Sequence, residues 1–179
     1  MAIIEAIATT YLEAEASSVT FSSIPSTYEH LQIRMSARNT FNYPAGVPNL
    51  TFNGVTSSVY STFAHNANAS SPAGFRTVGQ AYIRAPMSTT GNGVNNYIDR
   101  LNTGDYGPAV IDIFDYRNAD TNTTVMADSA TALTHTSPYI SFASGLFDDK
   151  TVITSITLGG GDGNWMRGSR FSLYGLKSS

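Results

Sequence analysis

The residues from Thr151 to Lys177 constrain the fold most, because they hold two β-patterned runs joined by a glycine-rich turn. The second run, Arg170 to Leu176, is rich in Phe and Tyr, and the segment between the runs, 159–163, reads GGGDG. Two such runs around a Gly/Asp turn predict a long hairpin, which we expect to lie in the middle of a β-sandwich. The first run has the period of two that is typical of a half-buried strand. One face would carry Val152, Thr154, Ile156 and Leu158, and the other Ile153, Ser155 and Thr157.

The same period recurs near the N-terminus with a cleaner separation of apolar and polar residues. One face of residues 31–38 is predicted to be buried and the other to be solvated, which requires an antiparallel sheet with one wet face. The buried set is Leu31, Ile33, Met35 and Ala37, and the solvated set is Gln32, Arg34, Ser36 and Arg38.

About eight to ten short strands, separated by Gly, Pro, Asn and Ser turns, predict an all-β protein, an antiparallel sandwich or barrel. A second hairpin is expected around Asn53-Gly54, and Ala109, Ile111 and Ile113 are expected to face inward, opposite Asp112. Loops are expected at 39–49 and 66–74, and one helical turn is an alternative for residues 128–133. Residues 4–12 fit either a helix or a strand, and Thr9, Thr10 and Tyr11 favour the strand. The remaining strands are predicted at 18–22, 59–63, 75–83, 94–101, 109–116, 125–133 and 139–142.

The 179 residues are enough for one domain with a substantial core, so we expect a single domain over 1–179. Residues 1–16 are expected to form either an N-terminal arm or an edge strand. The net charge is −3 and Lys150 and Lys177 are the only lysines, so we expect neither nucleic acid nor a membrane surface as partner. Cysteine is absent, which excludes disulfides and thiolate sites. No signal peptide is recognisable at the N-terminus, so we expect synthesis in the cytoplasm.

The residues that could carry chemistry do not form a convincing site. His30, His65 and His135 are far apart in the sequence and lack metal-ligand spacing, so structural or surface roles are favoured. Asp112 and Asp115 lie on either side of Ile113-Phe114, and Asp112 fits a solvated strand position. Asp148-Asp149 fit the turn before the last two strands. Nothing in the sequence singles out a pair of carboxylates whose environments would separate their pKa values for acid–base catalysis.

The glycine-rich segment 159–163 is predicted to be a turn, because phosphate-binding loops lead into a helix and this one leads to another strand. Asp162 is a single carboxylate, which is weak evidence for the six to eight oxygens of a calcium site. We therefore expect no catalytic, cofactor-binding or metal-binding residues, and we do not expect the protein to be an enzyme. Aromatic residues such as Trp165 fit three roles, namely core packing, protein–protein contact or sugar stacking.

Two segments resemble motifs of a known group of proteins. Residues 17–37 read SSVTFSSIPSTYEHLQIRMSA, and Phe52-Asn53-Gly54 follows them. The closing segment contains ITSITL at 153–158, Gly163-Asn164 and GSRFSLYGL at 168–176. These patterns are similar to those of small virion proteins and fibre domains of tailed bacteriophages. The resemblance covers both ends of the chain, and residues 64–145 carry little of it.

The resemblance implies a jelly-roll-like β-sandwich located in a virion, and it brings no catalytic residues. We expect a capsid decoration, or cement, protein on the capsid surface that binds the major capsid protein and stabilises the head. A symmetric oligomer such as a trimer is expected. Residues 1–16 and the loops at 39–49 and 64–74 are expected to make the contacts, since they are polar and least constrained by strands. The alternative is a tail-fibre or receptor-binding module that recognises host-surface carbohydrate. A glycan-cleaving enzyme is the weakest hypothesis, for want of paired acids.

Overall fold

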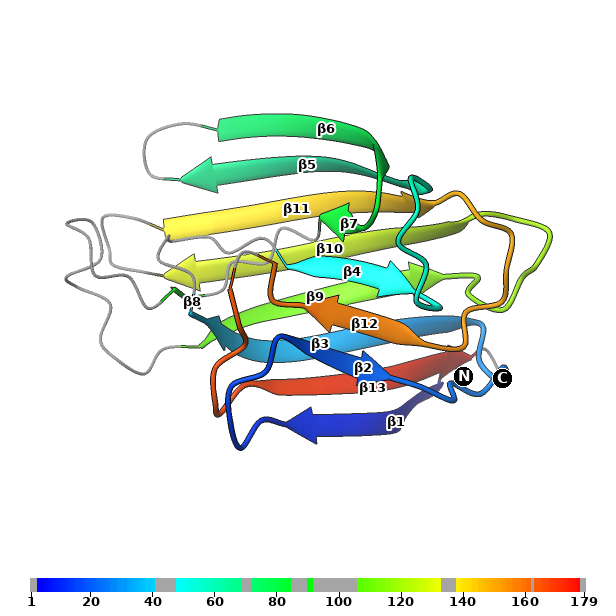
Figure 1. Cartoon of the computed structure of the whole chain (residues 1–179), viewed down its shortest axis with the longest axis horizontal. Helices are drawn as coiled ribbons and strands as arrows, with labels where there is room; N and C mark the ends of the chain where they lie inside the picture. Colours follow the sequence, from blue (N-terminus) through cyan, green and yellow to red (C-terminus); the bar gives the residue numbers. More distant parts are fainter. Residues whose placement is uncertain are drawn as a thin grey trace.

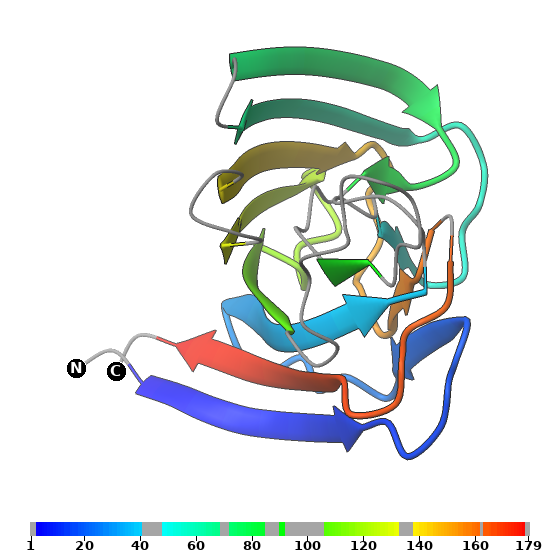
Figure 2. The ribbon, with the colours of Figure 1, turned by 90° about the vertical axis from the view of Figure 1, so that its left-hand side faces the viewer.

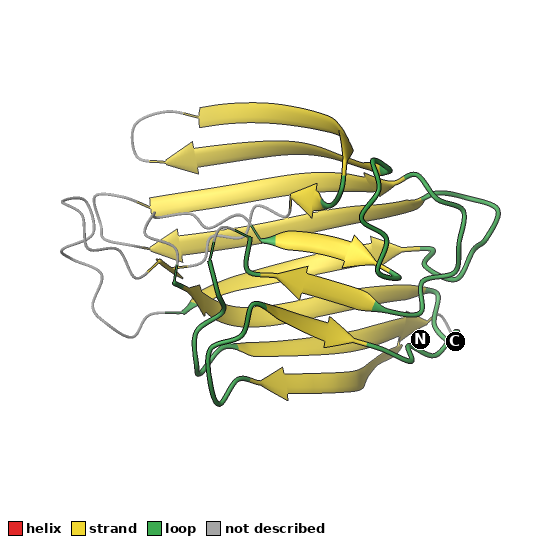
Figure 3. Cartoon of the chain, viewed as in Figure 1, coloured by secondary structure: helices red, strands yellow, loops and turns green. Residues whose placement is uncertain are grey.

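The computed structural model describes residues 3–40, 48–68, 72–84, 90–91, 106–132, 138–161 and 163–177. Within these residues the protein is all-β and contains no helix, and the strands form two sheets that pack as a β-sandwich (Figures 1 and 3). The described part of the chain accordingly has no helix with the length and apolar character needed to cross a bilayer. The finer expectation of jelly-roll connectivity stays a prediction.

The large sheet has the order β1-β13-β3-β9-β10-β11-β5-β6, and its neighbours along this path all pair antiparallel. The short β8 adds a parallel pair at the end of β3. The bounds are β1 (Ile3–Tyr11), β3 (His30–Asn39), β5 (Tyr60–Asn68), β6 (Pro72–Gln80), β8 (Thr90–Gly91), β9 (Gly107–Phe114), β10 (Thr123–Ala132), β11 (Pro138–Phe147) and β13 (Arg170–Lys177).

The small sheet has the order β2-β12-β4-β7 and covers one face of the large sheet. Its strands are β2 (Ser18–Phe21), β4 (Asn49–Phe52), β7 (Ile83–Arg84) and β12 (Ile156–Gly159). Seen end-on in Figure 2, the large sheet curves into an arc, and the small sheet lies on its inner side. The outer face of the large sheet is therefore left uncovered by the small one.

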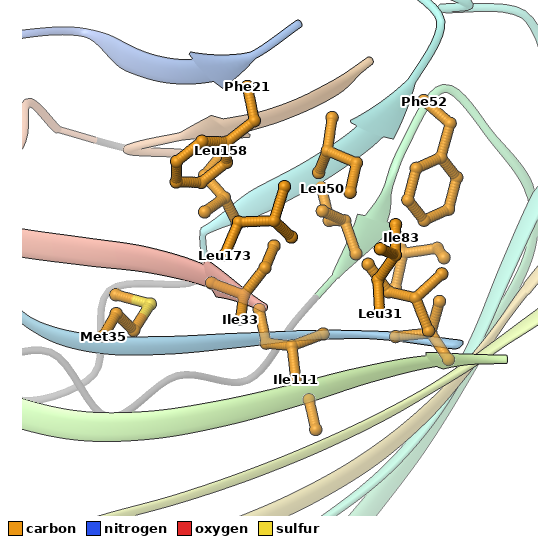
Figure 4. Packing of buried hydrophobic residues seen from close by; sticks show 14 of the residues in the cluster. Phe21, Leu31, Ile33, Met35, Leu50, Phe52, Ile83, Ile111, Leu158 and Leu173 are labelled. Carbon is orange, nitrogen blue, oxygen red and sulfur yellow. The ribbon is translucent and has the colours of Figure 1, made fainter. Parts of the chain in front are cut away.

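The core lies between the two sheets and follows the predicted alternation. Leu31, Ile33 and Met35 of β3 point into it together with Ile111 of β9 and Leu50 of β4 (Figure 4). Ala109, Ile111 and Ile113 are buried, whereas Asp112 lies on the other face, as predicted. The period-two pattern was thus a sound guide to which side chains face the core.

Both predicted hairpins are wrong. β12 pairs with β2 and β4, whereas β13 pairs with β1 and β3, so the glycine-rich segment crosses from one sheet to the other. In the same way β4 lies in the small sheet and β5 in the large one, so Asn53-Gly54 also turns the chain between sheets. Both residues of that turn have positive φ, 51° and 69°, as a tight turn requires. Turn chemistry was predicted correctly, but it does not decide which strands pair.

Three local expectations also change. Residues 66–74 were expected to be a loop, but Asn66 pairs with Ala73 in the β5–β6 ladder. Residues 128–133 include no helical turn in the described portion, because β10 runs to Ala132. Ile153 was placed opposite Ile156, yet both are buried, since the regular strand begins only at Ile156. Residues 1–16 do supply an edge strand, β1. The strand predicted at 94–101 lies outside the described residues.

Candidate interaction surface

The predicted histidines and carboxylates occupy structural positions. The His30 Nδ1 accepts a hydrogen bond from the Asp115 backbone N–H at 3.1 Å, and lies 3.6 Å from the Asp115 carboxylate at the surface. Its ring packs edge-on against Phe114. The structure thus brings together His30 and Asp115, where Asp115 has a positive φ of 53° at the end of β9. His65 lies exposed on β5, and His135 lies outside the described residues.

Two of the remaining carboxylates are likewise hydrogen-bonded to neighbouring side chains. Asp112 accepts a hydrogen bond from Gln32 Nε2 at 2.7 Å, and Asp148 accepts one from Asn122 Nδ2 at 2.7 Å. Asp162 is not among the residues that the structure describes. No group of three or more His, Asp or Glu side chains suited to a metal ion occurs in the described ranges.

The glycine-rich segment is a corner that the core holds in place. The Asn39 side chain donates a hydrogen bond to the Gly160 carbonyl at 2.6 Å. A Cβ on Gly160 would lie only 2.1 Å from the Gly163 carbonyl oxygen, so the chain passes itself too closely for any side chain there. Trp165 is fully buried, and its Nε1–H donates to the Leu158 carbonyl at 2.9 Å. Trp165 is therefore a core residue and is not available for sugar stacking.

A polar cluster links β1 to β13, the pair of strands at one edge of the large sheet. Glu5 of β1 accepts hydrogen bonds from the Tyr28 hydroxyl and forms an ion pair with Lys177 of β13, both at 2.9 Å. The hydrogen bonds from Lys177 and Tyr28 lower the pKa of Glu5. The hydrogen bond to Glu5 in turn raises the pKa of Tyr28. These groups satisfy one another, so the cluster fixes β1 to β13.

The outer face of the large sheet carries a different kind of feature. Its half over β10, β11, β5 and β6, here called the apolar half, exposes five large apolar side chains. They are Phe63 (48% exposed), Val78 (54%), Met126 (53%), Ile140 (44%) and Phe142 (55%). The ladder register places them on one face, because Met126 pairs with Ser144, and Ser144 pairs with Phe63. Large apolar side chains grouped on one exposed face are typical of interaction sites.

Two shallow grooves flank this ridge of apolar side chains. One, of about 560 Å³, runs beside Phe63, Val78 and Met126, with Ser61 and Ser144 among its lining residues. The other, of about 270 Å³, runs beside Ile140 and Phe142. The apolar half therefore presents projecting rings next to hollows, on a backbone that the sheet holds rigid.

Charges of opposite sign stand at the two sides of the apolar half. Asp128 on β10 is exposed in the row that also holds Phe142 and His65. Arg76 is exposed on β6, paired with Phe63. β11 and β5 separate these two charges.

The other half of the outer face, over β1, β13 and β3, is polar by comparison. Arg34 lies over the Tyr174 ring with its guanidinium carbon 5.0 Å from the ring centroid, and its Nε donates to Gln32 at 2.7 Å. Ile4 and Tyr11, at the edge strand β1, are the exposed large apolar residues of this half.

Sequence reasoning missed the apolar half, although a signal was present. Met126, Ile140 and Phe142 sit at the positions of their strands that alternate with the buried residues. A large apolar residue on the outward phase of a strand breaks the in/out pattern and marks an exposed contact.

Comparisons with protein-family models, with curated proteins and with solved structures gave no match to this chain.

Proposed function

We propose that the protein is a structural component of a tailed-bacteriophage virion, and specifically a capsid decoration protein that binds the outer shell as a symmetric homo-oligomer. The observation that carries the proposal is the apolar half of the outer face, which is built for contact with another protein surface. The motif resemblance at both ends of the chain supplies the virion context. Its partner would be the major capsid protein, and its location the capsid surface.

The residues of the resembling motifs act as scaffold in the structure. Phe171 and Leu173 are fully buried in β13. Gly175 is where the Tyr28 ring packs, since a Cβ there would lie 2.2 Å from a ring atom. These residues form part of the core of the β-sandwich. The exposed side chains of the large sheet are therefore the ones that can contact another protein.

A sheet face suits the task of a cement protein. Its backbone is hydrogen-bonded on both sides, so docking orders few additional groups and costs little conformational entropy. Apolar surface buried between copies and against the shell would stabilise the assembly by about 25 cal/mol per Å² of area removed from water. The protein would hold neighbouring capsid subunits together against the pressure of packed DNA.

A second candidate is a tail-fibre or receptor-binding module for host-surface carbohydrate. Phe63 and Phe142 are exposed beside His65 and Asp128, and aromatic rings next to polar groups are what a sugar-binding surface needs. The hollows beside these rings are shallow, which suits flat protein contacts as well as it suits sugars.

Purified protein added to phage capsids that lack it tests the proposal. We expect co-sedimentation with the capsids, density at icosahedral positions on the shell, and a gain in resistance to heat. Density at the tail tip together with binding on a glycan array would support the second candidate instead. Capsids that lack the protein and lose no heat resistance would refute the cement role.

A further inference from the structure

We propose that the apolar half of the outer face binds a second copy of this chain, sheet against sheet, about a two-fold axis lying in the plane of contact. The inference rests on the proposed function in treating this face as a protein-binding surface. It assigns the apolar half to the contact between copies within the homo-oligomer, so that contact with the shell falls to the rest of the surface. The contact is two-fold, in place of the three-fold arrangement that the resemblance suggests.

The area of exposed apolar surface matches what such a contact requires. Five large side chains that are each about half exposed leave roughly 400–600 Å² of apolar surface open, if a complete large side chain offers roughly 150–250 Å². A standard interface buries about 800 Å² per partner, of which about 57%, or roughly 450 Å², is apolar. The apolar half alone thus supplies the apolar part of one partner's share.

The charge pattern of this face is complementary to that of a second copy of the same face. Asp128 and Arg76 flank the apolar side chains from opposite sides, and neither forms an ion pair with another described residue. A two-fold axis that passes between β11 and β5 would set Asp128 of one copy against Arg76 of the other, and would do so twice. An isologous contact has this property, because residue i meets j while j meets i.

The shape of the face agrees with the same axis. Phe142 is exposed in the same row as Asp128, and the groove beside Phe63, Val78 and Arg76 lies in the neighbouring rows, where it crosses the sheet as far as Met126. The rotation that pairs the charges also carries Phe142 of one copy towards this groove of the other. A projecting ring and a hollow on the same surface are self-complementary under a two-fold rotation.

The first test compares two matched aromatic substitutions by analytical ultracentrifugation at chain concentrations up to roughly 100 μM. Phe142 and Tyr11 are both 55% exposed, one on the apolar half and one at the edge strand β1. We expect wild-type dimers, a dimer dissociation constant raised about tenfold or more by Phe142→Ser, and no change with Tyr11→Ser. A wild-type monomer over this range overturns the proposal, as does a dimer that Phe142→Ser leaves intact.

The second test exchanges the two charges. Asp128→Arg and Arg76→Asp should each weaken the dimer, since each places like charges together at both ends of the contact. The double variant Asp128→Arg/Arg76→Asp should restore it towards the wild-type dissociation constant. Circular dichroism checks that each variant is folded. Additive loss in the double variant, or a wild-type trimer, overturns the two-fold arrangement.

The two proposals fail separately. A dimer that passes both tests but does not bind capsids leaves the self-association intact and refutes the decoration role. A protein that binds capsids as a monomer or trimer refutes the two-fold contact and leaves the decoration role standing.

Discussion

Replacement of Asn53 by alanine should destabilise the protein more than its partly exposed position suggests. Its Oδ1 accepts hydrogen bonds from the backbone N–H groups of Thr154 (2.8 Å) and Ser155 (3.2 Å), and its Nδ2 donates to the Val152 carbonyl (2.9 Å). One side chain therefore ties the turn after β4 to the segment that leads into β12. Asn53 also has a φ of 51°, a left-handed conformation that alanine adopts only at a cost.

The expected magnitude follows from these two effects. The three hydrogen bonds to backbone groups contribute about 0.5 kcal/mol each, at the low end of the usual range because water can replace them. A fourth, from the Thr154 hydroxyl to Oδ1, is longer at 3.3 Å and adds less. The left-handed backbone adds about 1 kcal/mol for alanine. Asn53→Ala should thus lower the free energy of unfolding by about 2–3 kcal/mol, or the melting temperature by roughly 5–10 °C for a chain of this size. Asn53→Gly should lower it by about 1 kcal/mol less, because glycine tolerates this φ.

Urea denaturation followed by the fluorescence of Trp165, the sole tryptophan, measures these differences. Asn118→Ala is the matched control, since Asn118 accepts one hydrogen bond from the Asp120 N–H within its own turn (2.9 Å). It should cost less than about 1 kcal/mol. The reasoning is refuted if Asn53→Ala is as mild as the control, or if the alanine and glycine variants are equally stable.

Three further predictions concern packing and charge. Gly175→Ala should destabilise the protein by about 1–3 kcal/mol in thermal melts, because its Cβ would meet the Tyr28 ring at 2.2 Å; an unchanged melting temperature would contradict this packing. Tyr60→Phe should cost about 1–2 kcal/mol in urea, because the buried hydroxyl accepts from the Phe52 N–H (3.0 Å); a neutral result would mean that the N–H finds another acceptor. Because the pKa of Glu5 is lowered in the folded state, its contribution is present above the ordinary carboxyl pKa and is lost as the pH falls through the folded value. Glu5→Gln should therefore flatten the acid limb of a plot of stability against pH. If the limb is unaltered, the loss of stability at low pH comes from other titratable groups.

Strand faces could be predicted from the sequence because a pleated strand alternates with a fixed period. Leu31, Ile33 and Met35 are buried as expected for that reason alone. Strand pairing could not be predicted in the same way. Asn53-Gly54 and the GGGDG segment are genuine turns, but each passes the chain from one sheet to the other. A tight turn fixes the local direction of the chain, whereas the partner of a strand depends on contacts far away in sequence.

The apolar half was missed because its signal, an apolar residue on the outward phase of a strand, can be recognised only once the core side is known. Until then the exposed Phe142 and the buried Phe147 look alike within one strand. The polar residues were a better guide. Asp112 proved to be a surface strand residue with Gln32 as its neighbour, as its alternation with Ile111 and Ile113 indicated. For the candidate surface, the sequence predicts which residues of a strand share a face. It does not predict which face of the large sheet is covered by the small sheet.

The order of strands in the large sheet has a consequence for how the chain reaches its native state. β1 pairs only with β13 among the described strands, and β13 also stands between β1 and β3. The Thr9–Ser172 hydrogen bond accordingly spans 163 residues. During synthesis β1 and the edge of β3 that pairs with β13 lack their partner strand until β13 has left the ribosome. We therefore expect slow, post-translational closure of this side of the sheet, with the nascent chain prone to aggregation until then.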